Sequence, residues 1–346
     1  MKALITGQTF VEEVKQKLEQ AGFEISNPTK HLEEADLIEA LQGVDAYLLG
    51  GVEKATAKAI MSADNLKVIA FLGVGYESFV DVDAATKRGI AVTNTPRANT
   101  EAVAEMTIGM MLAMRRQIPY INAAAKAGQW REDIVSRNLQ GNKLGIIGMG
   151  AIGQVVARRA HKGFDMEILY YSRTRKEHIE AEIGAQFVSL DALLTQSDFV
   201  SIHCTFTPET KGMIGAREIA LMKEDAILIN TARPWIVQPE ALYEALVNRR
   251  IAGAAMDGYY IEPAPRPEED PYKLLQLPDD VFIITTHLAY LTEDSIYTMC
   301  DMAANSVISI LVKQEEYPYI VNPEYVTYKT GSPQHRCRGS LASSIT

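Results

Sequence analysis

Polar side chains that suit acid–base chemistry follow three predicted strands in the second half of the chain. Arg233, Glu262 and His287 each come shortly after an apolar, strand-like run. The carboxyl ends of parallel strands meet at one edge of a sheet, so we expect these three side chains to converge there. An arginine holds a carboxylate with paired hydrogen bonds, and a carboxylate beside an imidazole favours the imidazolium that donates a proton. We therefore predict Arg233, Glu262 and His287 as catalytic residues, and we interpret His203, inside a predicted strand, as a core residue.

A glycine-rich turn in the middle of the chain has the spacing of a dinucleotide-binding loop. Gly148, Gly150 and Gly153 follow the apolar run 144–147 and open a helical pattern over 152–160. The first glycine suits a tight turn, the second lets backbone approach a pyrophosphate, and the third lets the helix pack close to the sheet. The positive end of the helix dipole then faces the phosphates. The predicted cofactor-binding residues here are Gly148, Gly150, Ala151, Ile152 and Gly153.

The residues after the next predicted strand indicate which dinucleotide binds. An acidic residue at this point would hold the ribose 2′-hydroxyl of NAD, but this strand ends in Tyr171 and continues into Ser172, Arg173 and Thr174. Arg173 can bind a 2′-phosphate through two hydrogen bonds, so NADP(H) is favoured over NAD(H). Ser172, Arg173 and Thr174 are therefore predicted cofactor contacts. A solvated basic turn that leaves the choice of cofactor loose is the alternative.

Composition argues against several other classes of partner. The 346 residues carry a net charge of -10 without a Lys/Arg run, which argues against nucleic acid and against an anionic membrane surface. The apolar stretch at the amino terminus is too brief for a signal peptide, and the most apolar window, 106–114, is too short to span a membrane. Cys204, Cys300 and Cys337 are widely spaced, so we expect neither a disulfide framework nor a metal site. We predict a cytoplasmic protein.

Strand-like and helix-like runs alternate on both sides of the glycine-rich turn. Such alternation predicts an α/β protein with two doubly wound domains. We expect a flavodoxin-like substrate domain from residues 1–98 plus 291–325, and a Rossmann dinucleotide-binding domain, 99–290, inserted into it. One long apolar-faced helix is predicted over 99–128. The polar, patternless segment 326–346 is predicted to be loosely ordered.

Several of these segments together resemble the D-isomer-specific 2-hydroxyacid dehydrogenase family, in particular its glyoxylate and hydroxypyruvate reductases. The resemblance covers nearly everything from Lys2 to about Asn322. The matching segments are Gly73-Val74-Gly75-Tyr76, residues 88–96, Val103-Ala104-Glu105, the glycine-rich turn, Asn230-Thr231-Ala232-Arg233, residues 257–263 and His287-Leu288-Ala289.

The resemblance implies hydride transfer between NADP(H) and a small 2-oxo acid or its D-2-hydroxy acid. It implies that Arg233 binds the substrate carboxylate and carbonyl, and that Glu262 pairs with His287 as the acid–base pair. It also implies a homodimer formed through the nucleotide domain. Further implied contacts are Val74, Gly75 and Tyr76 for the substrate, where backbone N–H groups form an anion nest, and Thr231, Ala232 and Asp257 for the cofactor.

The chain departs from the family pattern at a few positions. Pro234-Trp235 replaces a usual glycine after Arg233, and Tyr290 follows the histidine segment. Arg97 stands where a small residue is usual, and it is either an exposed cation or a reader of a second anionic group on the substrate. Two other functions stay open: a phosphite-type dehydrogenase with the same three residues, and a nucleotide-sensing scaffold like the C-terminal-binding-protein corepressors. Glu262 speaks against a formate dehydrogenase, for which an amide partner of the histidine is expected.

Overall fold

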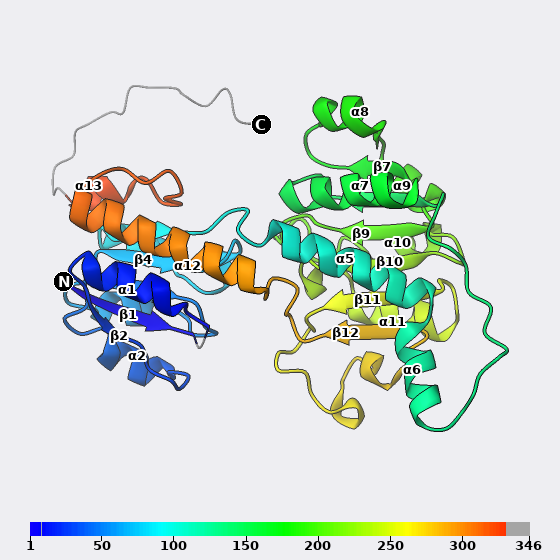
Figure 1. Ribbon diagram of the computed structural model, residues 1–346, viewed down its shortest axis with the longest axis horizontal. Coiled ribbons are helices and arrows are strands. Elements are labelled where there is room, and N and C mark those ends of the chain that lie inside the picture. The colour runs from blue at the N-terminus through cyan, green and yellow to red at the C-terminus, as the bar shows by residue number, and fades with distance from the viewer. Residues whose placement is uncertain (8, 330–346) are drawn as a thin grey trace. The chain divides into compact units, whose positions relative to one another are not determined.

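The computed structural model describes residues 1–7 and 9–329 and divides into two compact units. The first unit contains Met1–Asn99 and the chain from Glu293 onward, and the second contains Thr100–Thr292. Figure 1 shows the chain leaving the first unit, completing the second and returning. Within the segment predicted to be loosely ordered, 326–346, residues 326–329 belong to helix α13 (Tyr325–Lys329), and 330–346 lie outside the described residues.

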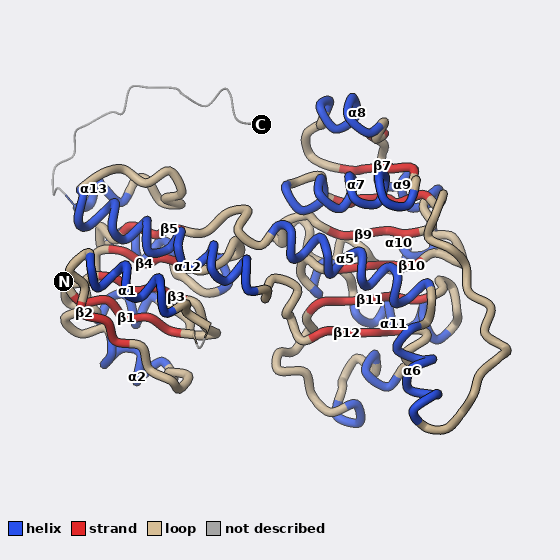
Figure 2. Tube along the Cα trace, in the orientation of Figure 1, coloured by secondary structure: helices blue, strands red, loops and turns tan. Residues whose placement is uncertain are grey.

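The first unit is built on a five-stranded parallel sheet in the order β2-β1-β3-β4-β5 (Figure 2). This order, with its reversal after β1, is that of a flavodoxin-like doubly wound sheet. Alternate residues of strands β1, β3, β4 and β5 enter two apolar clusters, one packed with α2, α3 and α4 and the other with α1 and α12. The elements are β1 (Lys2–Thr6), α1 (Glu12–Gln20), β2 (Glu24–Ser26), α2 (Glu34–Ala40), β3 (Ala46–Leu49), α3 (Ala57–Ser62), β4 (Val68–Phe71), α4 (Val82–Lys87), β5 (Ala91–Thr93) and α12 (Glu293–Ile308).

The returning helix α12 is a core helix of the first unit. With the π-helical turn Ser309–Lys313 that continues it, this stretch is long and apolar enough to cross a membrane by length and composition alone. Its apolar side is used within the unit, because Cys300, Ala303 and Val307 are buried against α1 and the sheet. The Asp301 carboxylate on the same helix accepts a hydrogen bond of 2.6 Å from Lys17 of α1. The packing therefore explains the apolar composition.

The second unit is built on a seven-stranded parallel sheet in the order β12-β11-β10-β9-β6-β7-β8. The order reverses between β6 and β9, as in a Rossmann fold, and this reversal creates the crevice where such sheets bind ligands. Both faces are covered by apolar clusters. The elements are α5 (Thr100–Arg115), α6 (Ile118–Lys126), β6 (Lys143–Ile147), α7 (Ala151–Phe164), β7 (Glu167–Tyr171), α8 (Glu177–Ile183), β8 (Gln186–Phe187), α9 (Leu190–Gln196), β9 (Phe199–Ile202), α10 (Ala216–Leu221), β10 (Ile227–Asn230), α11 (Pro239–Val247), β11 (Gly253–Asp257) and β12 (Phe282–Thr285).

The prediction of a single long helix over 99–128 is wrong, because the structure has two helices there. Helix α5 ends at Arg115, and Gln117 takes a left-handed conformation with φ 50° before α6 begins. Pro119 then occupies the first turn of α6, where its missing N–H costs nothing. Apolar periodicity continues across the break, which is why the pattern alone did not reveal it.

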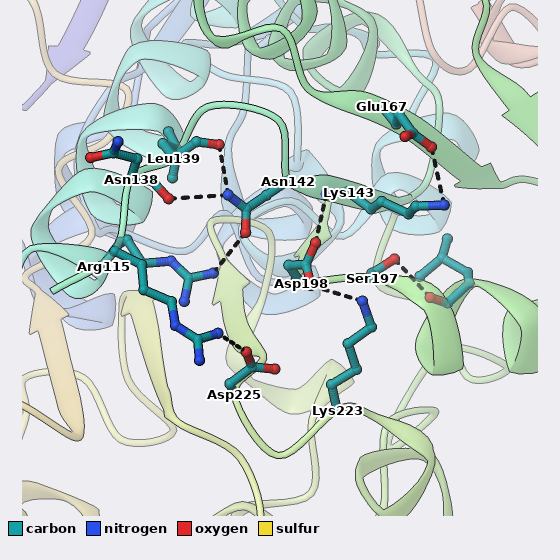
Figure 3. A network of polar contacts seen from close by, with 12 residues as sticks. Arg115, Asn138, Leu139, Asn142, Lys143, Glu167, Ser197, Asp198, Lys223 and Asp225 are labelled. Carbon is teal, nitrogen blue, oxygen red and sulfur yellow. Dashed lines mark hydrogen bonds and ion pairs between the residues drawn. The ribbon is translucent and has the colours of Figure 1, made fainter.

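A polar network lies at the amino-terminal edge of the second sheet, where strands β6, β7 and β9 begin (Figure 3). Asp198, just before β9, accepts hydrogen bonds of 2.8 Å from the Lys143 backbone N–H and from the Lys223 ammonium. Burial would raise the pKa of Asp198, but these donors outweigh it and lower the pKa. Arg115 donates to Asn142 from the end of α5. These contacts fix where the strands start, and the candidate site lies at their other ends.

Candidate active site

Three side chains at the carboxyl edge of the second unit lie in a row. His287 Nδ1 is 3.1 Å from Glu262 Oε2 and 3.2 Å from Glu262 Oε1, and His287 Nε2 is 3.4 Å from Arg233 Nη1. Arg233 follows β10, Glu262 follows β11 and His287 follows β12, which are neighbouring strands. The structure therefore brings together the three residues singled out at the strand ends. Because Glu262 accepts from Nδ1, Nε2 is the imidazole atom left to exchange a proton.

The side chain of Asn230, the last residue of β10, shapes the turn that presents Arg233. Its Nδ2 donates to the Arg233 carbonyl at 2.9 Å, and its Oδ1 accepts from the Ala232 N–H at 3.0 Å. Thr231 is buried in the same turn, with its hydroxyl 2.9 Å from that of Thr107 on α5. Asn230 thus shapes the turn of a candidate site residue, although the sequence singled it out only as part of a matching segment. Its signal is an amide at a strand end, ahead of a turn that needs both a donor and an acceptor.

Asp257 holds the turn that carries His287. His287 has φ 60°, an unfavourable region for a residue with a Cβ, so its neighbours must hold it there. Asp257 is 3% exposed, and its carboxylate accepts from the Leu288 N–H at 2.9 Å, the Ala289 N–H at 3.0 Å and the Thr285 hydroxyl at 2.5 Å. The structure thus gives this carboxylate an orienting role beside His287. The cofactor contact implied for Asp257 stays a prediction.

Glu262 is held as a charged group by its surroundings. Burial favours the neutral carboxyl, but hydrogen bonds from His287 and from the Tyr259 N–H, and the charge of Arg233, outweigh burial and lower the pKa of Glu262. Gly258 makes room for the carboxylate: its φ is +92°, and a Cβ there would lie 2.5 Å from Glu262 Oε1. Gly258 is not among the site residues predicted from the sequence. Its only signal was a glycine next to a strand end with an acidic residue four positions later.

The glycine-rich turn has the geometry that a dinucleotide requires. A Cβ at Gly148, where φ is +101°, would lie 2.5 Å from the Cys204 backbone nitrogen, and a Cβ at Gly153 would lie 2.3 Å from the Gly148 carbonyl oxygen. A Cβ at Gly150 would meet nothing within 4 Å. Two of the glycines are therefore needed by the protein itself, whereas Gly150 borders open space. Helix α7 begins there without a side-chain cap, so its first N–H groups, at Ala151, Ile152 and Gly153, fit an incoming phosphate.

The basic turn after β7 contains one engaged arginine and one available arginine. Arg175 forms paired hydrogen bonds with Glu180, whose carboxylate also accepts from the Tyr170 hydroxyl. Arg173 is exposed and has no ion pair within the described part of the chain. Ser172 is partly buried and Thr174 is exposed beside it. Arg173, close enough to Glu209 to lower the pKa of that carboxyl but without an ion pair to it, is thus available to meet a 2′-phosphate.

The predicted substrate loop of the first unit offers two backbone donors. Val74 is 44% exposed, and the N–H groups of Val74 and Gly75 donate no hydrogen bond to the residues that the structure describes. The Gly73 carbonyl accepts from the Thr95 N–H at 3.0 Å, which fixes the loop. Neighbouring free N–H groups of this kind form a nest for an anion. Tyr76 is partly buried at the start of a 3-10 turn, and Arg97 is exposed with φ 67°.

The departures from the family pattern in the second unit form aromatic contacts. Trp235 meets the ring of Tyr260 edge-on, with 5.3 Å between ring centroids, and the ring of Tyr272 at 6.2 Å. Tyr290 lies edge-on to the His287 ring, with 6.4 Å between centroids. Pro234-Trp235, which stands in place of the usual glycine, therefore joins the Arg233 turn to an aromatic cluster.

The comparisons with known proteins agree on one protein family. Residues 108–289 match the model of the D-isomer specific 2-hydroxyacid dehydrogenase NAD binding domain. A glyoxylate reductase of Thermococcus litoralis is 40% identical over 299 residues, which cover 84% of this chain and 87% of that protein. The crystal structure of a glyoxylate reductase from Paecilomyes thermophila has a TM-score of 0.81 at 29% identity and covers 94% of this chain and 98% of its own. The D-lactate dehydrogenase of Escherichia coli has a TM-score of 0.79 at 27% identity, with coverage of 93% and 100%.

The protein belongs to the D-isomer specific 2-hydroxyacid dehydrogenase family. It is accordingly an oxidoreductase with a Rossmann domain for a nicotinamide cofactor, as the sequence predicts. The fold class of two parallel α/β sheets is confirmed as well.

Proposed function

We propose that the protein reduces a small 2-oxo acid of the glyoxylate type to its 2-hydroxy acid with NADPH. The observation that carries this proposal is the row formed by Arg233, His287 and Glu262, in which His287 Nε2 lies 3.4 Å from the guanidinium and Nδ1 faces a carboxylate. The similarity to several glyoxylate reductases supports the choice of acid.

The proposed roles follow from the atoms that face one another. The bound cofactor supplies a hydride to the carbonyl carbon. Arg233 binds the carboxylate and carbonyl of the acid, and the proton on His287 Nε2 moves to the carbonyl oxygen as it becomes an alkoxide. Glu262 stays ionised and stabilises the imidazolium, which solvent protonates again afterwards. In the first unit, the N–H groups of Val74 and Gly75 are the proposed donors to the acid's carboxylate.

The preference for NADPH rests on the end of strand β7. No acidic residue stands there to accept from a ribose 2′-hydroxyl, and the exposed Arg173 has no ion pair among the described residues. Ser172 and Thr174 supply hydroxyls beside it. Thr231, Ala232 and Asp257 are proposed contacts for the nicotinamide half of the cofactor. The test is the ratio of kcat/KM for NADPH to that for NADH, and a higher value for NADH would contradict this assignment.

Arg97 is proposed to read a second anionic group on the substrate. The basis is an exposed guanidinium on a turn just after β5, where no ion pair within the described chain engages it. Arg97→Ala is then expected to raise KM for a dicarboxylic 2-oxo acid much more than KM for glyoxylate. Equal changes for the two acids would assign Arg97 to the solvent-exposed surface instead.

We propose a homodimer formed by a second copy of this chain at the second unit. An apolar groove of about 500 Å³ runs between α5, α6 and the edge strand β12, lined among others by Met110, Leu277 and Ile284. Trp130 and Val135, in the extended segment that follows α6, are 83% and 92% exposed and offer apolar surface to a second copy. Sedimentation analysis of Trp130→Ser against wild type tests this, and a wild type that stays monomeric at high micromolar concentration would exclude the dimer.

A cytoplasmic location is the proposal that fits the thiols. Cys204 and Cys300 are free, and burial raises the pKa of both thiols to about 11, so both stay protonated and unreactive. Free thiols are typical of a reducing compartment. Cell fractionation with the full chain tests this location.

A further inference from the structure

The buried carboxylate of Asp270 is linked through Tyr259 to Glu262 of the active-site row. Asp270 is 4% exposed and lies in the segment after β11. Its Oδ2 accepts from the Tyr259 hydroxyl at 2.6 Å and from the Leu275 N–H at 3.0 Å, and its Oδ1 accepts from the Tyr272 N–H at 3.1 Å. Two backbone donors therefore fix the carboxylate, and the carboxylate in turn fixes the end of the Tyr259 side chain.

The backbone of the same tyrosine contacts Glu262. The Tyr259 N–H donates to Glu262 Oε1 at 3.0 Å, and this oxygen also lies 3.2 Å from His287 Nδ1. Gly258 has φ +92° just before it, a conformation in which glycine gives the backbone little resistance to rotation. The Gly258 N–H donates to the Thr285 carbonyl at 2.9 Å and holds the chain before Tyr259, and the phenol held by Asp270 fixes the chain after it.

We propose that Tyr259, anchored by Asp270, is the positioning residue that keeps the Glu262 carboxylate aimed at His287. The chain of contacts runs from the buried carboxylate to the phenol, from the phenol through its own backbone to Glu262, and from Glu262 to the imidazole. Tyr259 and Asp270 touch neither substrate nor cofactor in this scheme. The inference rests on the proposed function only for its kinetic consequence, because the geometry is independent of the substrate.

Tyr260 is a matched control for Tyr259. The two tyrosines are adjacent, are 4% and 6% exposed, and pack edge-on with 5.5 Å between their rings. The Tyr260 hydroxyl donates to the Val237 carbonyl at 3.0 Å, away from Glu262. Tyr259→Phe and Tyr260→Phe each remove one buried hydroxyl that forms one hydrogen bond. Tyr259→Phe is expected to cost more stability, because its hydroxyl donates to a carboxylate, so the comparison uses the pKa of Glu262 and not the stability. Only Tyr259→Phe releases the backbone that contacts Glu262.

The decisive experiment is the titration of the Glu262 carboxyl by NMR in the full chain labelled with ¹³C-glutamate. The signal is assigned by its loss in Glu262→Gln. In Tyr259→Phe the weaker N–H contact is expected to raise the pKa of Glu262 by about half a pH unit or more, and Tyr260→Phe is expected to leave it at the wild-type value. An unchanged pKa in Tyr259→Phe, or the same change in both variants, would overturn the proposal.

A kinetic measurement separates this inference from the proposed function. The acid limb of kcat/KM for glyoxylate reduction is expected to move to higher pH in Tyr259→Phe only, with KM for NADPH unchanged. A shift of the limb in Tyr260→Phe as well would overturn the positioning role. If wild type reduces no 2-oxo acid, the proposed function fails, and the NMR titration still decides whether Tyr259 positions Glu262.

Discussion

Arg173 offers the sharpest test of cofactor choice, because the structure separates it from its neighbour Arg175. Arg175 is already paired with Glu180, whereas Arg173 is exposed and lacks an ion pair among the described residues. A hydrogen bond to a charged group contributes about 1.5 to 3 kcal/mol, and solvent exposure favours the lower end of that range. Since about 1.4 kcal/mol corresponds to a factor of ten in affinity, Arg173→Gln is expected to raise KM for NADPH roughly tenfold or more.

The assay is the steady-state rate with glyoxylate and either NADPH or NADH. KM for NADH is expected to change less than about twofold in Arg173→Gln, because NADH has no 2′-phosphate to lose contact with. Arg175→Gln is the matched control and is expected to leave the NADPH to NADH ratio near that of wild type. Equal losses with both cofactors in Arg173→Gln, or an unchanged KM for NADPH, would refute the assignment of Arg173.

Three further predictions concern Gly150, Gly258 and His203. Gly150→Val is expected to leave the melting temperature near that of wild type, because a Cβ there meets nothing within 4 Å. The same variant is expected to weaken NADPH binding at least tenfold in a fluorescence titration. A large fall in melting temperature would contradict this prediction. Gly258→Ala places a Cβ 2.5 Å from the Glu262 carboxylate and is expected to lower kcat at least tenfold with NADPH binding intact. The control is Gly163→Ala on α7, where a Cβ meets nothing within 4 Å, and it is expected to leave kcat unchanged. Burial lowers the pKa of His203 to about 3. Below a pH of about 6.5, the unfolded chain therefore binds a proton at His203 that the folded chain does not bind. The free energy of unfolding then falls as the pH drops. At pH 5 the full shift would lower the free energy of unfolding by about 2 kcal/mol, and because His203 is partly exposed we expect about 1 kcal/mol. Urea unfolding at pH 7 and pH 5 measures this loss. The loss is expected to be smaller in His203→Gln.

The parts of the site that the sequence predicted are those fixed by strand ends. Parallel strands bring their carboxyl ends to one edge, so Arg233, Glu262 and His287 needed only the alternation of elements to be placed together. The glycine-rich turn was equally readable from its spacing, and two of its glycines are demanded by close backbone contacts, Gly153 with Gly148 and Gly148 with Cys204.

The parts that the sequence did not predict depend on contacts between segments distant in the chain or on local backbone conformation. The break at Gln117 is one left-handed residue inside an unbroken apolar pattern. The pairing of Arg175 with Glu180, which leaves Arg173 available, depends on where helix α8 places its carboxylate. The role of Asp270 required the path of the whole segment after β11, since nothing in its own sequence neighbourhood indicates the contact with Tyr259.

In the proposed mechanism, His287 Nε2 donates the proton while Arg233 holds the acid and Glu262 holds the imidazole. The most direct test is the rate of NADPH consumption with glyoxylate by wild type and by His287→Gln, with NADPH binding measured in both. This role of His287 predicts reduction by wild type and a loss of about 10² to 10⁴ in kcat for the variant, at unchanged NADPH affinity. Turnover by His287→Gln close to that of wild type would contradict it.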